Sequence, residues 1–167
     1  SKLFLYKMLE HYQLKNMIKV YEIVNSDLEK ELLNIYPDIN KVIEKEDTEA
    51  YKQVSISVFD HWLSKEEAKR LLSNVPKEVQ NNRDEKFNNF HSSIIKESKV
   101  YGYIYHQQTG ENKFVNFTTE NDVAKYLQEG MFSIVIPDIK SIYISGYDDT
   151  NHIYYQERTL LEKLERQ

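Results

Sequence analysis

The fold is decided by residues 99–117, which read KVYGYIYHQQTGENKFVNF. Tyrosines stand at every second position of its first half, and mostly apolar residues stand between them: Tyr101, Tyr103 and Tyr105 alternate with Val100, Gly102, Ile104 and His106. A period of two is typical of a β-strand, because successive side chains point to opposite faces. The TGEN stretch at 109–112 favours a turn into a second strand over 113–117. The segment is therefore predicted to form a β-hairpin.

Four stretches outside this hairpin also favour strands. Over 51–59, Val54, Ile56 and Val58 alternate with mostly polar residues, which predicts a strand with one face in water. Residues 132–136 and 139–145 are largely apolar and are separated by Pro137. A polar turn over 146–151 then leads into a return strand over 152–156.

The chain before the hairpin is predicted to be mostly helical. Apolar residues recur at helical spacing over 3–21, although 18–24 also fit a strand. Ser26 and Ser64 each precede a Glu by three positions, which is the pattern of a capping box at a helix N-terminus. Other predicted helix starts lie at or just after Pro37, Pro76, Thr119 and Thr159.

Helices followed by short consecutive strands indicate an α+β fold. We expect a helical N-terminal half followed by a mainly antiparallel sheet of about five or six strands, with helices packed on one face. The length of 167 residues suits one domain, and no linker-like stretch divides the chain. A single α+β domain over 1–167 is therefore expected.

The composition excludes several kinds of protein. The chain has no cysteine, so disulfide scaffolds, cysteine-ligated metal sites and thiol chemistry are excluded. The net charge is −5, with 22 Lys and Arg against 27 Asp and Glu, which argues against nucleic acid as a partner. Apolar stretches fall short of the roughly 20 residues that a membrane span needs. We expect a cytoplasmic protein that binds no membrane and uses no cofactor.

Histidines and carboxylates offer the remaining routes to catalysis. His91 begins an H-x-S triplet, which resembles half of the signature of the 2H phosphoesterases, but the chain holds no second triplet of this kind. His91 also falls among apolar residues of a predicted helix, which favours a place at the edge of the core. Asp148, Asp149 and His152 are close enough in sequence to share a metal ion, yet Asp is an ordinary residue of hairpin turns. No metal site and no catalytic residue is assigned.

The tyrosines are the most unusual feature, since the chain has 13 of them and several fall on the two predicted hairpins. If the row of Tyr101, Tyr103 and Tyr105 faces solvent, it offers large, rigid side chains of the kind common in protein interfaces. If the row is buried, it belongs to the core. The alternate row is apolar enough to be the core side, which favours an exposed tyrosine row.

A small, acidic, cysteine-free α+β protein rich in Lys, Asn, Ile and Tyr is similar in kind to bacterial immunity and antitoxin proteins. The resemblance implies a non-enzymatic protein that binds and inhibits a basic toxin such as a nuclease. The residues expected to contact this partner are Tyr101, Tyr103, Tyr105, Tyr147, Asp148, Asp149 and His152. Two alternatives stay open: a phosphodiesterase or nuclease that uses His91, His106 or His152, and a phage-derived inhibitor of a host enzyme.

Overall fold

The structure is a computed structural model that describes residues 21–165. The helix predicted over 3–20 lies outside the described residues. Residues 21–23, for which helix is favoured over strand from the sequence, form strand β1 (Tyr21–Ile23), so the helix prediction is wrong there. This strand pairs antiparallel with residues 115–117, so the strand interpretation holds for this part of the chain.

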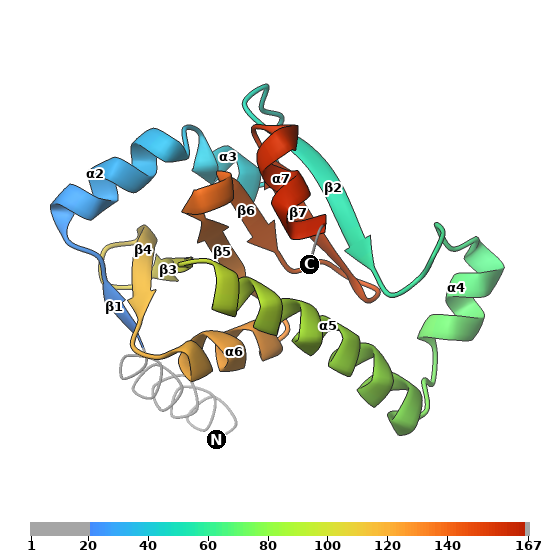
Figure 1. Ribbon diagram of the computed structural model, residues 1–167. Coiled ribbons are helices and arrows are strands. Elements are labelled where there is room, and N and C mark those ends of the chain that lie inside the picture. Colours follow the sequence, from blue (N-terminus) through green and yellow to red (C-terminus); the bar gives the residue numbers. More distant parts are fainter. Residues whose placement is uncertain (1–20, 166–167) are drawn as a thin grey trace, which may run out of the picture.

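Seven strands of the described chain form one antiparallel sheet in the order β1-β4-β3-β5-β6-β7-β2 (Figure 1). Those after β1 are β2 (Lys52–Ser57), β3 (Tyr101–His106), β4 (Glu111–Phe117), β5 (Ser133–Ile136), β6 (Ser141–Ile144) and β7 (Thr150–Tyr155). The predicted strands all form, and β1 is the additional one. Because β1 and β2 provide the two edges of the sheet, the N-terminal half is not purely helical.

The described part of the chain also has six α-helices. They are α2 (Ser26–Ile35), α3 (Ile39–Ile43), α4 (Lys65–Leu72), α5 (Lys77–Glu97), α6 (Glu120–Gln128) and α7 (Arg158–Glu165), and a short 3₁₀ helix, η1 (Pro137–Ile139), joins β5 to β6. The capping box at Ser64 is confirmed. At α2 the cap is instead Asn25, whose Oδ1 accepts a hydrogen bond from the Leu28 amide at 2.9 Å, because Ser26 is already helical.

Helices cover both faces of the sheet, and the expectation of one covered face is wrong. On one face, residues of α5, α6 and α7 pack against Ile134 and Ile136. On the other face, residues of α2 and α3 pack against Val135 and Ile142. The reason is visible at 134–136, where three consecutive apolar residues are all fully buried, as in strands that are covered on both sides.

Candidate functional site

A cavity of about 1010 Å³ lies along β2, the strand at one end of the sheet, and we call it the edge groove. Apolar side chains of β2, α4, α5 and α7 line it, among them Val54, Ile56, Ala68, Leu72, Phe90 and Leu161. The loop between β2 and α4 and the turn between β6 and β7 complete its wall. The groove therefore joins segments that are distant in sequence.

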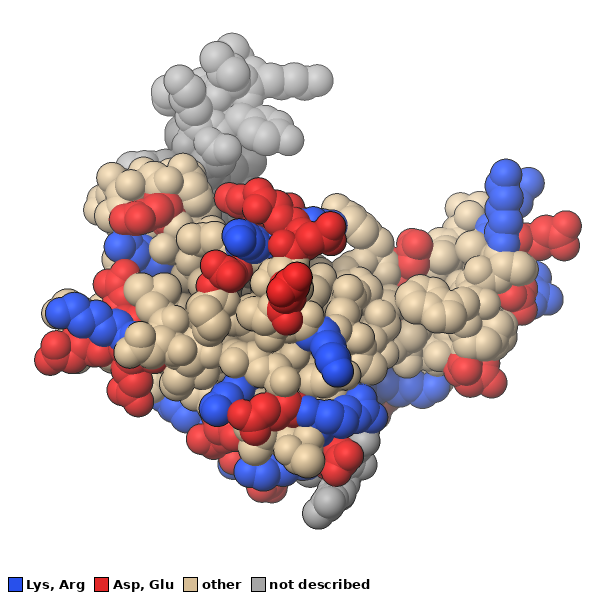
Figure 2. Space-filling model, turned by 90° about the horizontal axis from the view of Figure 1, so that it is seen from above, with Lys and Arg blue, Asp and Glu red and all other residues tan. Residues whose placement is uncertain are grey.

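Helix α4 contributes an apolar face that no core covers. None of its residues is buried, although Ala68 and Leu72 face the edge groove. Figure 1 shows α4 set apart from the sheet, joined to it by the loop after β2 and by the long helix α5. In Figure 2, a broad uncharged surface continues from the main body toward the lobe on the right that carries α4. The apolar side of α4 is thus open to an occupant of the groove.

Two large aromatic side chains stand exposed where the edge groove meets solvent. Trp62, in the loop after β2, is 81% exposed, and Tyr147, in the turn before β7, is 79% exposed. Single exposed apolar residues are common, but here two aromatics line one concave site. Tyr147 was expected at a binding surface, whereas Trp62 was missed by the sequence analysis. Its signal was the only tryptophan of the chain, placed in the short stretch between a predicted strand and a predicted capping box.

The charges on the wall of the edge groove are acidic. Among the described residues that line it, Asp60 and Asp148 carry carboxylates and no Lys or Arg contributes. The His61 ring also lines it, in contact with Asp60. A second cavity of about 470 Å³ lies next to it, with Lys45, Glu46 and Asp47 in its wall. Gln53, Tyr147 and His152 line both cavities, so the two meet at Gln53, near the start of β2.

His61 holds the loop that carries Trp62. Its Nδ1 contacts the Asp60 carboxylate, and its Nε2 lies 3.0 Å from Oε1 of Glu67 in the first turn of α4. These two carboxylates raise the pKa of His61. The Ser64 amide and the His61 ring together lower the pKa of Glu67 to about 2. The loop is therefore tied to the start of α4 by charged hydrogen bonds on the surface.

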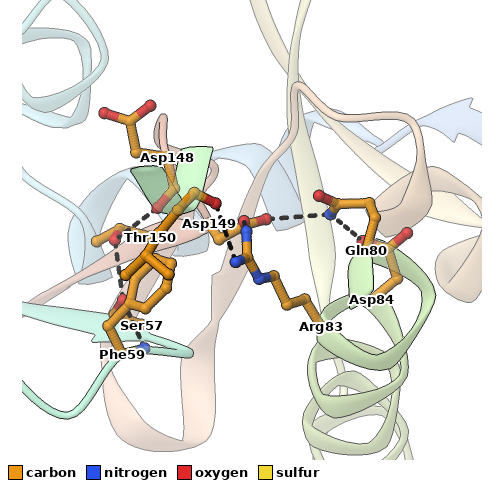
Figure 3. A network of polar contacts seen from close by, with 9 residues as sticks. Ser57, Phe59, Gln80, Arg83, Asp84, Asp148, Asp149 and Thr150 are labelled. Atoms are coloured by element: carbon orange, nitrogen blue, oxygen red, sulfur yellow. Dashed lines mark hydrogen bonds and ion pairs between the residues drawn. The ribbon is translucent and has the colours of Figure 1, made fainter. Parts of the chain in front are cut away.

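Asp149 is bonded to side chains of α5 and positions the β6–β7 turn (Figure 3). Its Oδ2 accepts a hydrogen bond from Arg83 Nη1 of α5 at 3.0 Å, and its Oδ1 accepts one from Gln80 at 3.3 Å. The second Arg83 nitrogen donates to the carbonyl of Leu71, at the end of α4. Arg83 also lies over the Phe59 ring. One guanidinium thus connects both helices and the turn. Asp148 is exposed beside it and is free of this ion pair.

His152 takes part in a cross-strand network on the groove wall. Its Nδ1 lies 3.0 Å from Ser55 Oγ and 2.9 Å from Gln53 Nε2, both on the neighbouring strand β2. Burial and, to a lesser degree, the nearby Lys45 lower the pKa of His152. Because Nδ1 accepts these bonds, the ring proton is on Nε2. His152, Tyr147 and Asp148 all line the edge groove.

The tyrosine row of β3 is largely a core feature. Tyr103 is only 5% exposed, packs on Phe114, and donates from its hydroxyl to Asn40 Oδ1 of α3 at 2.7 Å. Burial raises the pKa of Tyr103 to about 12. Tyr101 is half-buried, and Tyr105 is exposed. The expected exposed row is therefore wrong at Tyr103, because both faces of β3 are covered and a strand alternation does not tell one covered face from the other.

His91 is a buried residue of α5. Its Nε2 lies 2.8 Å from the Tyr143 hydroxyl, which also accepts a bond from Asn151 Nδ2 at 2.8 Å. Burial lowers the pKa of His91 to about 4. His91 and His152 lie on opposite faces of the sheet, since Asn151 and Ile153 share the face of His91. The two imidazoles therefore do not form one site. In residues 21–165, no cluster of three or more His, Asp or Glu side chains is arranged to hold a metal ion.

No family model, curated protein or solved structure matches this chain with significant similarity. Among the helices described, none has both the length and the apolar character needed to cross a membrane.

Proposed function

We propose that this protein acts by binding another protein, and that its partner is a basic one, such as a nuclease toxin that it inhibits. The observation that carries the proposal is the edge groove, where exposed Trp62 and Tyr147 accompany an apolar lining. Tryptophan and tyrosine dominate binding energy in protein interfaces, because they bury a large rigid area at a small cost in conformational entropy.

The charge of the site supports a basic partner. Asp60 and Asp148 stand on a wall that holds no Lys or Arg among its described residues, and the chain as a whole carries a net charge of −5. Complementary charge mainly speeds association and excludes wrong partners. The proposed contacts therefore keep Tyr147, Asp148 and His152 from the sequence prediction and add Trp62 and Asp60. In this proposal Tyr103 stabilises the core and Asp149 stabilises the β6–β7 turn, and neither contacts the partner.

The proposal is tested with a panel of basic nuclease toxin domains, by measuring both binding and protection of cells that express them. Trp62→Ala and Tyr147→Ala are expected to weaken binding of the cognate domain by roughly tenfold or more each. Met131→Ala is the matched control, because Met131 is a similarly exposed apolar residue that does not line the groove. Equal affinities for the two groove variants, the control and the unmodified protein would overturn the proposal. Hydrolysis of nucleotides by the protein itself, lost in His152→Ala, would also contradict it.

A further inference from the structure

We propose that the partner contributes an extended segment that adds to the free edge of β2 as a further strand of the sheet, with apolar side chains on one face and basic side chains on the other. This inference rests on the proposed function and specifies how the edge groove is occupied. It depends on three observations: an open strand edge, two cavities that meet near the start of that edge, and the difference in character between them.

The first observation is the open edge. All six residues of β2 pair with β7, and within residues 21–165 no strand pairs with its other side. The amide of Val58 donates to the carbonyl of Asp149, which continues the ladder. Because hydrogen-bonded and non-bonded pairs alternate in an antiparallel ladder, Gln53, Ser55 and Ser57 direct their amides and carbonyls away from β7. These groups are available to an incoming strand.

The edge also lacks the usual protection against strand addition. Natural sheet edges commonly carry charged residues, proline or a bulge, which discourage pairing with another chain. From Gln53 to Ser57 the sequence is QVSIS, with no charge and no proline, and its register with β7 is unbroken. The one charged residue of the strand is Lys52, at its beginning.

The second and third observations, the two cavities and their different character, indicate which side chains an added strand would carry. Such a strand lies roughly 4.8 Å from β2 and places alternate side chains on the two faces of the sheet. On one face they meet the apolar lining that includes Val54, Ile56 and Leu72. On the other face they meet the side of Gln53 and His152. The second cavity there holds Lys45 beside Glu46 and Asp47, so carboxylates outnumber the ammonium group two to one. The segment that fits is therefore alternately apolar and basic.

A second copy of this chain is a poorer occupant of the same edge. It carries the same net charge of −5 and would bring its own Asp60 and Asp148 to the contact. Like charges brought together at an interface are costly. The charge of the site thus favours a basic segment over self-association through β2.

The experiment uses the full chain and a synthetic peptide of about eight residues that alternates valine and lysine. Amide hydrogen exchange is measured residue by residue with and without the peptide. Exchange at Gln53, Ser55 and Ser57 is expected to slow by roughly tenfold or more, because their amides gain partners. Exchange at Val54 and Ile56 changes far less, since these amides already bond to β7. A valine and glutamate peptide is the charge control and is expected not to bind.

Two further arms separate strand addition from other modes of docking. The same valine and lysine peptide with alternate backbone nitrogens methylated keeps its side chains but loses its strand hydrogen bonds, and its affinity is expected to fall by roughly tenfold or more. On the protein, Ser55→Pro removes an outward amide without removing a bond to β7, whereas Ser55→Thr keeps that amide. Binding is expected to be lost in the first variant and kept in the second. The methylated peptide decides the question if Ser55→Pro does not fold.

Several results would overturn the inference. Binding without slower exchange at Ser55 and Ser57, or equal affinity of the methylated peptide, would show docking without strand addition and would leave the proposed function intact. Failure of the valine and lysine peptide to bind would overturn the strand mode, while the toxin panel tests the function separately. Slower exchange that depends on protein concentration alone, together with a dimer in sedimentation, would assign the edge to a second copy.

Discussion

At the scale of single residues, the buried chain of Asn151, Tyr143 and His91 shows how a polar group is accommodated in the core. Asn151 donates to the Tyr143 hydroxyl, which lies 2.8 Å from His91 Nε2, and burial of the imidazole favours its neutral form. No partner for His91 Nδ1 is present among the described atoms. The imidazole is therefore costly to protonate where it lies.

This geometry predicts a loss of stability in mild acid. Burial lowers the pKa of His91 from 6.5 to about 4, so the unfolded chain takes up a proton between these values that the folded chain does not. The free energy of unfolding therefore falls as the pH drops from about 7 to about 4, by roughly 3 kcal/mol at about 1.4 kcal/mol per pKa unit. His91→Gln is expected to remove most of this decline in denaturant titrations at several pH values.

The control for this prediction is His106→Gln, which removes an imidazole at the end of β3 outside the core clusters. It is expected to keep the decline seen in the unmodified protein. The pKa of His152 is also lowered, so this residue makes the free energy of unfolding fall further as the pH drops. The pKa of His61 is raised, so this residue makes the free energy of unfolding rise as the pH drops. An unchanged pH profile in His91→Gln would show that another group controls acid stability.

The sequence predicted the surroundings of some of these residues but not of others. The interpretation of His91 as a residue at the edge of the core was right in kind, because its apolar neighbours on α5 fix which way the helix faces. The role of Asp149 could not be predicted, since its partner Arg83 is 66 positions away in sequence and the turn gives no sign of that pairing.

At the scale of elements, the Arg83 and Asp149 pair joins α5, the end of α4 and the β6–β7 turn. The two side chains are 11% and 17% exposed, so each is poorly hydrated if the other is removed. Arg83→Met is expected to lower the free energy of unfolding by about 2–4 kcal/mol, as measured by chemical denaturation. It is also expected to loosen the turn that carries Tyr147 and Asp148.

An exposed ion pair provides the comparison. Lys140 and Glu157 lie 3.0 Å apart on the surface, and Lys140→Met is expected to cost about 1 kcal/mol or less. If Arg83→Met costs no more than Lys140→Met, the guanidinium does not hold these elements together.

Elements were predicted better than their packing. The alternation over 101–105 identified β3 but not the face that is buried, because both rows are covered. The run of apolar residues at 134–136 indicates that both faces of the sheet are covered there. A strand with one face in water would alternate apolar and polar residues. Strand β1 was ambiguous because three residues are too few to establish a period.

At the scale of the whole molecule, the central strands are covered on both faces, while the β2 end of the sheet opens into two cavities. The sequence could not reveal the edge groove, because it depends on β2 pairing with β7, as at Ser55 and His152, which are 97 positions apart. The expectation of a basic partner came from the composition of the chain alone. The carboxylates of Asp60 and Asp148 on the wall of the edge groove agree with that expectation. Binding is therefore expected to weaken as salt concentration rises.

The most direct measurement is the fluorescence of Trp62, the only tryptophan of the chain, during titration with the valine and lysine peptide. If basic extended chains occupy the edge groove, the emission shifts to shorter wavelength and acrylamide quenching decreases, because a side chain that is 81% exposed becomes covered. Calorimetry on the same samples reports binding independently. Unchanged emission and quenching at concentrations where calorimetry shows the peptide bound would contradict the account.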